Sequence, residues 1–493
     1  MGSLRCTQAS SADAARWGRL RFTSGLVALT SWLRRPCSVV RELAEVELSD
    51  LIGLAERVAS WTKAAGADEA EAYVAWAKDT YTTLQGDVFS TREGVSAGVG
   101  VRAVIGRKVG FASASSLEEA KLRSAAEKAV EIARVRPEDP KFHRLPDPVR
   151  RPARSGGFDE QIIEIGAADV VPQAKSVSSE ALSADRRVKY VVVFIYTQAY
   201  MFGVANTRGI SCGDRASKFM GIVECKVSDG SEERTGSDHV YGRRIAELAG
   251  IGERAARLAA DSLGARGLDQ PVVGHVLFDS TTASMMLSML TYGVSARSVQ
   301  EGRSRLEGKL GKQVASKELT IVDDAWMKDG LGTVAYDGEG VPTTVKPVIE
   351  DGMLRNYLYD SYAAHIEGKK STGNGMRSWF TSQPSIREVN YMVRPSSRSP
   401  DDLLSEVELG VYVRGDLMGL GHANYVTGDF SVVATNAFLV RRGSIEHPLP
   451  PTTIAGNFYE MLKTARVGSD LRLSPIGKIP SILVSGLTAA TRR

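Results

Sequence analysis

The stretch that decides the fold of the N-terminal half is residues 95–115, VSAGVGVRAVIGRKVGFASAS. Apolar residues alternate with small or polar ones along 95–105 and along 109–115, and Gly106-Arg107-Lys108 separates the two runs. Period-two alternation on both sides of a short glycine-containing turn is typical of a β-hairpin. A similar alternation at residues 69–76, EAEAYVAW, predicts another strand just before it.

Helical patterns flank these strands. Residues 48–65 place Leu51, Ala55 and Val58 on one face, with Ser49 or Asp50 as the cap and Gly66 at the end. A capping-box pattern at 116–119 predicts a second helix to about residue 134. Strands are expected from 188 to about 227 with a turn at 206–209, followed by a helix over about 243–263. This mixture predicts an α+β domain with antiparallel strands.

The C-terminal half is expected to be β-rich. A strand at 274–278 precedes a helix over 282–298, and the Glu350-Asp-Gly352 turn predicts a hairpin. Two more helices are expected, over 401–409 and 454–467. A chain of 493 residues exceeds one ordinary core, so we divide it into domains at 48–267 and 268–493. Residues 1–47, rich in Arg and Ser, are expected to be an extension outside both domains.

Composition excludes several classes of protein. The 62 basic residues interleave with 58 acidic ones and leave a net charge of only +4, so a nucleic-acid partner is not expected. The most apolar central run, 190–196, is far shorter than a membrane span. The four cysteines form no CxxC and no zinc-finger spacing. These features predict a reduced, cytoplasmic, globular protein.

Most motifs for catalysis are missing. No two of the six histidines lie at the helical spacing that a zincin site needs. Residues 94–98 match G-x-S-x-G, but the alternation continues through them, so Ser96 is predicted to be an ordinary strand residue. Two glycine-rich polar segments, 337–342 and 370–375, are either simple turns or loops that line a cleft. The candidate cleft residues are Asp337, Glu339, Ser371, Thr372, Gly373, Asn374 and Gly375.

An ordered set of segments resembles the TldD/PmbA family, whose members have also been named modulators of DNA gyrase. The set comprises DGEGVPT (337–343), IEDGMLRNYLYD (349–360), KSTGNG (370–375), TGDFS (427–431) and NFYEMLK (457–463). The resemblance runs from about residue 48 to the end of the chain. It implies an α/β N-terminal domain, a β-rich C-terminal domain, and intracellular peptidase complexes that trim or degrade flexible peptides. In these complexes a zinc-bearing TldD-like subunit pairs with a PmbA-like subunit that lacks zinc.

The chain departs from the zinc-bearing branch. The TldD-like pattern has an HExxxH helix and a C-terminal cysteine, whereas this chain has LSMLTY at 287–292 and no cysteine in 468–493. The resemblance therefore implies a PmbA/TldE-like subunit with no catalytic or metal-binding residues of its own, inactive alone, with zinc in its partner. We expect a heterodimer, or a homodimer when the chain is alone. Two alternatives stay open: a hydrolase that uses Asp337 and Glu339 as paired carboxylates, and a non-catalytic peptide- or protein-binding module.

Overall fold

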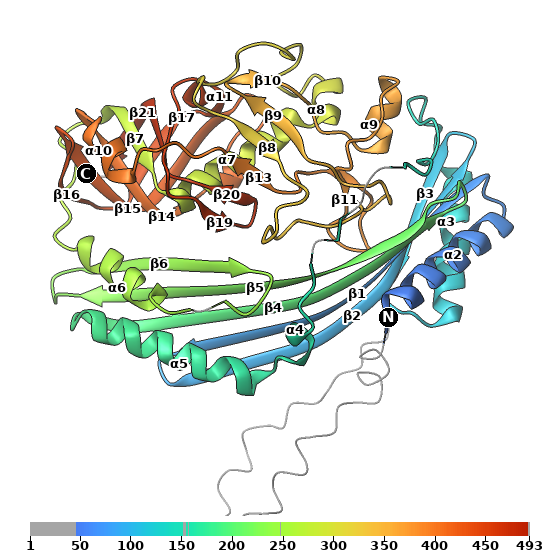
Figure 1. The fold of residues 1–493 in the computed structure, drawn as a ribbon, viewed down its shortest axis with the longest axis horizontal. Helices are drawn as coiled ribbons and strands as arrows, with labels where there is room; N and C mark the ends of the chain where they lie inside the picture. Colours follow the sequence, from blue (N-terminus) through green and yellow to red (C-terminus); the bar gives the residue numbers. More distant parts are fainter. Residues whose placement is uncertain (1–45, 151–153, 156, 247, 492–493) are drawn as a thin grey trace, which may run out of the picture. The chain divides into compact units, whose positions relative to one another are not determined.

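A long antiparallel sheet forms the N-terminal half of the computed structural model, which describes residues 46–150, 154–155, 157–246 and 248–491 (Figure 1). Six strands lie in the order β3-β2-β1-β4-β5-β6. Their bounds are β1 Glu69–Gln85, β2 Val88–Ile105, β3 Lys108–Ala114, β4 Val188–Asn206, β5 Ser211–Ser228 and β6 Glu233–Gly242. The predicted hairpin at 95–115 is β2 and β3, with Gly106 at a φ of 60°, and is confirmed. Ser96 is a residue of strand β2, also as predicted.

Helices cover one face of this sheet (Figure 1). They are α2 Leu48–Ala64, α3 Glu119–Val135, α4 Gln161–Glu164, α5 Ala167–Ala184 and α6 Ile251–Asp261. The contact is close because glycine faces the helices: a Cβ on Gly110 would lie 2.0 Å from the carbonyl oxygen of Ala129 in α3. The two predicted helices α2 and α3 are confirmed, but their caps are Glu47 and Glu118 rather than the predicted residues.

Two N-terminal predictions need correction. The helix expected over 243–263 begins only at Ile251, because Gly250 has a left-handed φ of 83° that no helix accommodates. Helix α5 was not predicted, and it contains Pro172 in its second turn, where the proline removes one backbone hydrogen-bond donor. The expected extension falls almost wholly on residues 1–45, outside the described residues, and the domain boundary at 267/268 stays a prediction.

The C-terminal half contains a sheet that closes on itself. Strands β14-β7-β21-β17-β15 follow one another, and β15 also pairs with β14. β16 and β18 extend it at its edges. The bounds are β7 Val272–Phe278, β14 Leu409–Met418, β15 Asp429–Arg441, β16 Ser444–Leu449, β17 Thr452–Asn457, β18 Arg466–Val467 and β21 Ile482–Thr491. Helix α7, Ser280–Val294, packs with Met286, Leu287 and Leu290 in the same core as Val413 and Phe458.

A second, smaller sheet lies beside it, with the strand order β10-β9-β8-β13-β20-β19. Its bounds are β8 Ile321–Asp323, β9 Lys346–Glu350, β10 Met353–Leu354, β13 Tyr391–Val393, β19 Arg472–Ser474 and β20 Gly477–Ile479. The predicted turn between β9 and β10 is confirmed, with Asp351 and Gly352 at φ values of 48° and 77°. The remaining elements are β11 Gly375–Met376, β12 Ser385–Ile386, α8 Ala296–Gln300, α9 Ser361–Ile366, α10 Pro400–Ser405, α11 Phe458–Leu462 and a short 3-10 turn at Leu420–His422.

Two helix predictions in this half were wrong in extent. Residues 452–457 form strand β17, because they pair with β15 and β21, and only Phe458–Leu462 is helical. Helix α10 ends at Ser405, and β14 has begun by Leu409. The α+β class and the β-rich C-terminal half are confirmed. In the described ranges, no helix is both long and apolar enough to cross a membrane.

The face of the long sheet opposite the helices packs against C-terminal loops. Phe380 lies in one apolar cluster with Tyr73 and Phe202 of β1 and β4. A Cβ on Gly98 would come within 2.6 Å of the Phe380 ring, so glycine in β2 is what admits this contact. Between this face and the C-terminal loops lie the cavities described below.

Candidate functional site

The two glycine-rich loops predicted from the sequence meet inside the protein. Gly338 N donates to Gly375 O at 2.9 Å, and Gly375 N donates to Asp337 Oδ2 at 2.9 Å. The other oxygen of Asp337 accepts from the backbone N–H groups of Glu339 and Val341. Asp337, Glu339 and Asn374 are at most 1% exposed. The structure therefore brings the candidate residues together and buries all of them except Thr372, which is partly exposed.

The backbone N–H groups of Gly338, Gly373 and Gly375 are bonded within the protein. Besides the two bonds just given, Gly373 N donates to Ser371 Oγ at 3.2 Å. A Cβ on Gly373 would lie 2.5 Å from Pro342 O, and one on Gly375 would lie 2.6 Å from Glu339 Oε2. Glycine is needed here for close packing. Direct peptide contact by the seven candidate residues stays a prediction.

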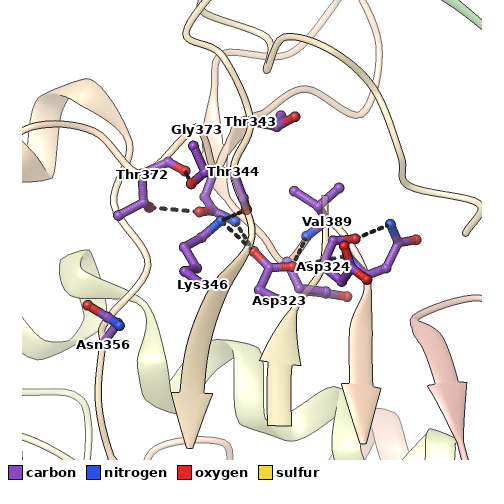
Figure 2. Close-up of polar contacts among 12 residues, drawn as sticks. Asp323, Asp324, Thr343, Thr344, Lys346, Asn356, Thr372, Gly373 and Val389 are labelled. Atoms are coloured by element: carbon purple, nitrogen blue, oxygen red, sulfur yellow. Dashed lines mark hydrogen bonds and ion pairs between the residues drawn. The ribbon is translucent and has the colours of Figure 1, made fainter. Parts of the chain in front are cut away.

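A buried ion pair fixes the base of these loops (Figure 2). Lys346 Nζ lies 3.0 Å from Asp323 Oδ2, and Val389 N donates to the other oxygen of Asp323 at 2.7 Å. Asn374 Nδ2 also donates to Asp323, at 2.8 Å, and Thr344 Oγ1 donates to Thr372 O at 3.3 Å. The second loop is thus held from β8 and β9, which rigidifies it.

A second buried network ties the first loop to the long sheet. Arg102 of β2 donates through Nε to Glu71 Oε1 at 2.9 Å and through Nη2 to Glu339 Oε1 at 3.1 Å. Arg377 also donates to Glu71. The other oxygen of Glu339 accepts from Ser361 N at 2.8 Å. The charges of two glutamates and two arginines therefore neutralise one another across the two halves of the chain, as buried charges require.

The electrostatics of Asp337 follow from this burial. Loss of solvent, and then the neighbouring Glu339 carboxylate, raise the pKa of Asp337 well above its usual value. Its oxygens accept three backbone hydrogen bonds, and Glu339 is paired with Arg102. Neither carboxyl lines a cavity in the described part of the chain that adjoins the long sheet. Their arrangement suits a structural crosslink rather than an acid–base pair that must reach a substrate.

A cavity of about 470 Å³ lies between the long sheet and the C-terminal loops. Alternate residues of two adjacent strands form its floor, since successive side chains in a strand point to opposite faces. The roof comes from residues 331–338, 376–379 and 387–389. Gly338 and Met376, beside the predicted loop residues, line this cavity. The floor residues are Tyr196, Gln198 and Tyr200 of β4 and Ala216, Lys218 and Met220 of β5.

A second cavity, of about 370 Å³, adjoins the first. Both are lined by Tyr241 of β6 and by Pro475. One wall of the second cavity is a face of helix α7, and His239 lies opposite it on β6. The two cavities follow the same face of the sheet, so together they form a candidate groove for an extended ligand. The α7 residues that line it are Ser280, Thr281, Ser284, Met285 and Ser288.

This groove was not predicted from the sequence. The signal was present in β4, where polar and aromatic residues, Tyr196, Gln198 and Tyr200, recur at every second position. That pattern indicates a face with a special role, but the sequence does not say which distant loops cover it. One further feature of the groove is a buried histidine: His239 is 10% exposed, and its Nδ1 has no hydrogen-bond partner in the described chain.

Helix α7 is the place where a zinc site would be expected from the family resemblance. Leu287 is in the core at 1% exposure, Ser288 Oγ donates to Met285 O at 2.6 Å, and Tyr292 packs 6.0 Å from the Tyr425 ring. Serine, methionine and tyrosine do not fit the histidine, cysteine and carboxylate set that zinc prefers. Among the residues that the structure describes, no group of three or more His, Cys, Asp or Glu side chains could hold a metal ion.

The fold and groove define a class: an α+β protein in which a long, helix-backed antiparallel sheet and a β-rich second half enclose adjoining cavities. Comparison with family models then gives the family. The PmbA/TldA metallopeptidase domain 1 matches residues 70–133, its central domain matches 160–263, and its C-terminal domain matches 273–491. The chain belongs to the PmbA/TldD family, as the resemblance implied.

Individual relatives agree over most of the chain. A metalloprotease TldD homolog of Haemophilus influenzae is 26% identical over 82% of this chain and 86% of its own length. Metalloprotease PmbA of Escherichia coli O157:H7 is 26% identical over 92% of this chain and 99% of its own. The crystal structure of TldE from Thermococcus kodakarensis superposes with a TM-score of 0.81 and 24% identity, covering 89% of this chain and all of that one, which supports the fold.

Proposed function

We propose that the chain is the zinc-free, PmbA/TldE-like subunit of a PmbA/TldD-type metallopeptidase that acts in intracellular proteolysis or peptide maturation. The observation that carries the proposal is the cavity-lining face of α7, which presents Ser284, Met285 and Ser288. Zinc catalysis requires ligands and usually a carboxylate base on such a helix. In this proposal the partner subunit supplies the zinc, and this chain supplies none.

The contribution of this chain is to hold the substrate. Its groove combines aromatic and apolar walls with polar side chains that can orient a ligand. A flexible peptide can lie along the sheet face in an extended conformation, with side chains in the two cavities. This places the binding role on Tyr200, Trp379 and Tyr241, and the loops at 337–342 and 370–375 position the roof residues above them.

The proposal also implies which subunit this chain binds and where in the cell it acts. A subunit without a catalytic metal contributes to proteolysis only in contact with one that has it, so we propose a 1:1 heterodimer with a TldD-like subunit. The interface is of obligate size, above roughly 2,000 Å². A homodimer forms when the chain is alone, because related surfaces pair about a two-fold axis. A cytoplasmic location agrees with the thiols of Cys212 and Cys225, which are unpaired and whose pKa is raised by burial to about 12.

Co-expression with a zinc-bearing TldD-like subunit tests the proposal. We expect the purified chain alone to leave casein and unfolded peptides intact, and the complex to cleave them until a chelator is added. Trp379→Ala in this chain should slow turnover several-fold without preventing assembly, because it removes a groove wall. The matched control is Trp61→Ala, on helix α2 away from the cavities, which should leave turnover unchanged.

Three results would contradict this proposal. Chelator-sensitive cleavage by the isolated chain, retained after rigorous separation from the partner, would give it a catalytic metal of its own. Chelator-insensitive cleavage abolished by Asp337→Asn would favour the hydrolase alternative. If this chain bound peptide tightly but did not increase cleavage by the partner, the binding-module alternative would be favoured.

A further inference from the structure

The larger cavity contains a lysine whose ammonium group has no counter-ion among the residues that the structure describes. Lys218 lies in the middle of β5, opposite Gln198 of β4, and lines the cavity floor. Its Nζ makes no hydrogen bond or ion pair with any residue that the structure describes. The side chain is only partly exposed. An ammonium group partly withdrawn from water is stabilised by an anionic partner.

The carboxylates near Lys218 form hydrogen bonds with other groups. On the sheet, one oxygen of the Asp79 carboxylate accepts both from Tyr196 OH at 2.7 Å and from Gln198 Nε2 at 2.9 Å. Across the cavity, Glu388 accepts from Thr291 Oγ1 at 2.6 Å. Neither carboxylate forms an ion pair with Lys218 in the described chain.

Two further cations, Arg243 and Arg387, lie near Lys218. Arg243 donates to the carbonyl oxygens of Gly330 and Thr333, so the groups that it contacts there are neutral. Arg387, on the rim, is exposed and likewise has no side-chain partner among the described residues. Burial, and then the Arg243 guanidinium, hold the pKa of Lys218 below its usual value. A bound anion would relieve this repulsion.

The walls around Lys218 are aromatic. The Trp379 ring lies 5.8 Å from the Tyr200 ring, and Tyr241 follows toward the second cavity. In a site shielded from water by such rings, a charge-assisted hydrogen bond is stronger than at an open surface. The same rings offer flat apolar surfaces to the residues on either side of an anionic group.

We propose that Lys218 binds a carboxylate of the peptide held in the groove, either an Asp or Glu side chain or the C-terminal α-carboxylate. The residues flanking that carboxylate pack against Trp379 and Tyr200. This subsite rests on the proposed peptide-holding function and adds to it a preference for acidic over neutral peptides. Arg387 at the rim helps to attract the anion but does not contact it in the cavity floor.

Fluorescence anisotropy with the purified full-length chain tests the subsite. The probes are three labelled, flexible nonapeptides: one with a central Glu and an amidated C-terminus, its Gln counterpart, and the Gln peptide with a free C-terminal carboxylate. If the side chain is bound, the first should bind about tenfold more tightly than the second, as a charge-assisted hydrogen bond predicts. If the α-carboxylate is bound, the third should show that advantage.

Variants of Lys218 distinguish the effect of its charge from the effect of its apolar stem. Lys218→Met keeps the apolar stem and should abolish the preference for the acidic probe, whereas Lys218→Arg should retain most of it. The matched control is Lys226→Met, at the far end of the same strand in an exposed pair with Glu233, which should keep the full preference.

The outcomes distinguish this subsite from the wider proposal. Equal binding of all three probes by the native chain, still weakened by Trp379→Ala, would overturn the carboxylate subsite and leave the peptide groove standing. An unchanged preference in Lys218→Met, with thermal unfolding showing a folded protein, would also overturn it. Failure of the native chain to bind any probe would remove the peptide-holding function and the subsite together.

Discussion

Replacing Arg102 by methionine should destabilise the protein strongly, because it removes a cation shared by two buried carboxylates. Arg102 is 7% exposed and lies 2.9 Å from Glu71 and 3.1 Å from Glu339. In the native protein the two glutamates are balanced by Arg102 and Arg377. After the substitution two buried carboxylates share one guanidinium, and Arg377 contacts only Glu71.

The loss of stability expected for Arg102→Met follows from other buried ion pairs that lose one partner. Removing one partner of a buried ion pair costs about 3–5 kcal/mol, and methionine replaces only the apolar stem of the arginine. Since domains of this kind are stable by roughly 5–15 kcal/mol, the variant should lose a large share of its stability. Neutralising the carboxylate left unpaired, in the double variant Arg102→Met with Glu339→Gln, should recover about 1–2 kcal/mol.

Urea unfolding followed by circular dichroism, with linear extrapolation to water, measures these differences. The control is Arg257→Met, which breaks an exposed pair with Glu253 on helix α6 and should cost less than about 1 kcal/mol. If Arg102→Met cost no more than this control, the network would not be the crosslink between the halves that we infer. If the double variant were no more stable than Arg102→Met, Glu339 would not be the group left unpaired.

The remaining predictions concern pH, packing and assembly. Burial, and then the Glu339 carboxylate, raise the pKa of Asp360 from 3.8 to about 6. The carboxyl therefore ionises at lower pH in the unfolded chain than in the folded one, and the free energy of unfolding should fall as pH rises from about 4 to about 6. In urea unfolding, Asp360→Asn should flatten this part of the pH profile. Gly373→Val should cost at least about 2 kcal/mol in the same assay, because Gly373 has a φ of 74° and the new Cβ would lie 2.5 Å from Pro342 O. The control Gly53→Ala, in α2 with open space around it, should be neutral or stabilising. Equal effects of the two substitutions would refute the packing argument. Size-exclusion chromatography with light scattering should show a 1:1 complex with the TldD-like subunit, and a chain that remains monomeric beside that partner would contradict the proposed assembly.

Local patterns predicted the local structure well. The hairpin at 95–115 and the turn at Asp351 and Gly352 involve neighbouring residues, so alternation and turn chemistry were sufficient. The helix expected over 454–467 failed for the opposite reason. Residues 452–457 are extended because β15 and β21, distant in the sequence, pair with them on both sides. Tertiary pairing of this kind overrides local propensity.

The candidate site was predicted only in part. The sequence singled out 337–342 and 370–375, and the structure brings them together. Their burial depends on Arg102 and Asp323, which lie far away in the chain, so composition could not indicate it. Lys218 had no distinguishing sequence context at all. Its proposed role follows from the tertiary structure, because the roof loops cover this face of β5 and, among the described residues, none pairs with its ammonium group.

Metal analysis of the separated subunits tests the central claim most directly. The complex with the TldD-like partner is purified without chelator, the subunits are separated under conditions that retain tightly bound metal, and zinc is measured in each by mass spectrometry. We expect about one zinc per partner chain and none in this chain, because its α7 face presents serine and methionine. About one tightly held zinc per copy of this chain would contradict the account.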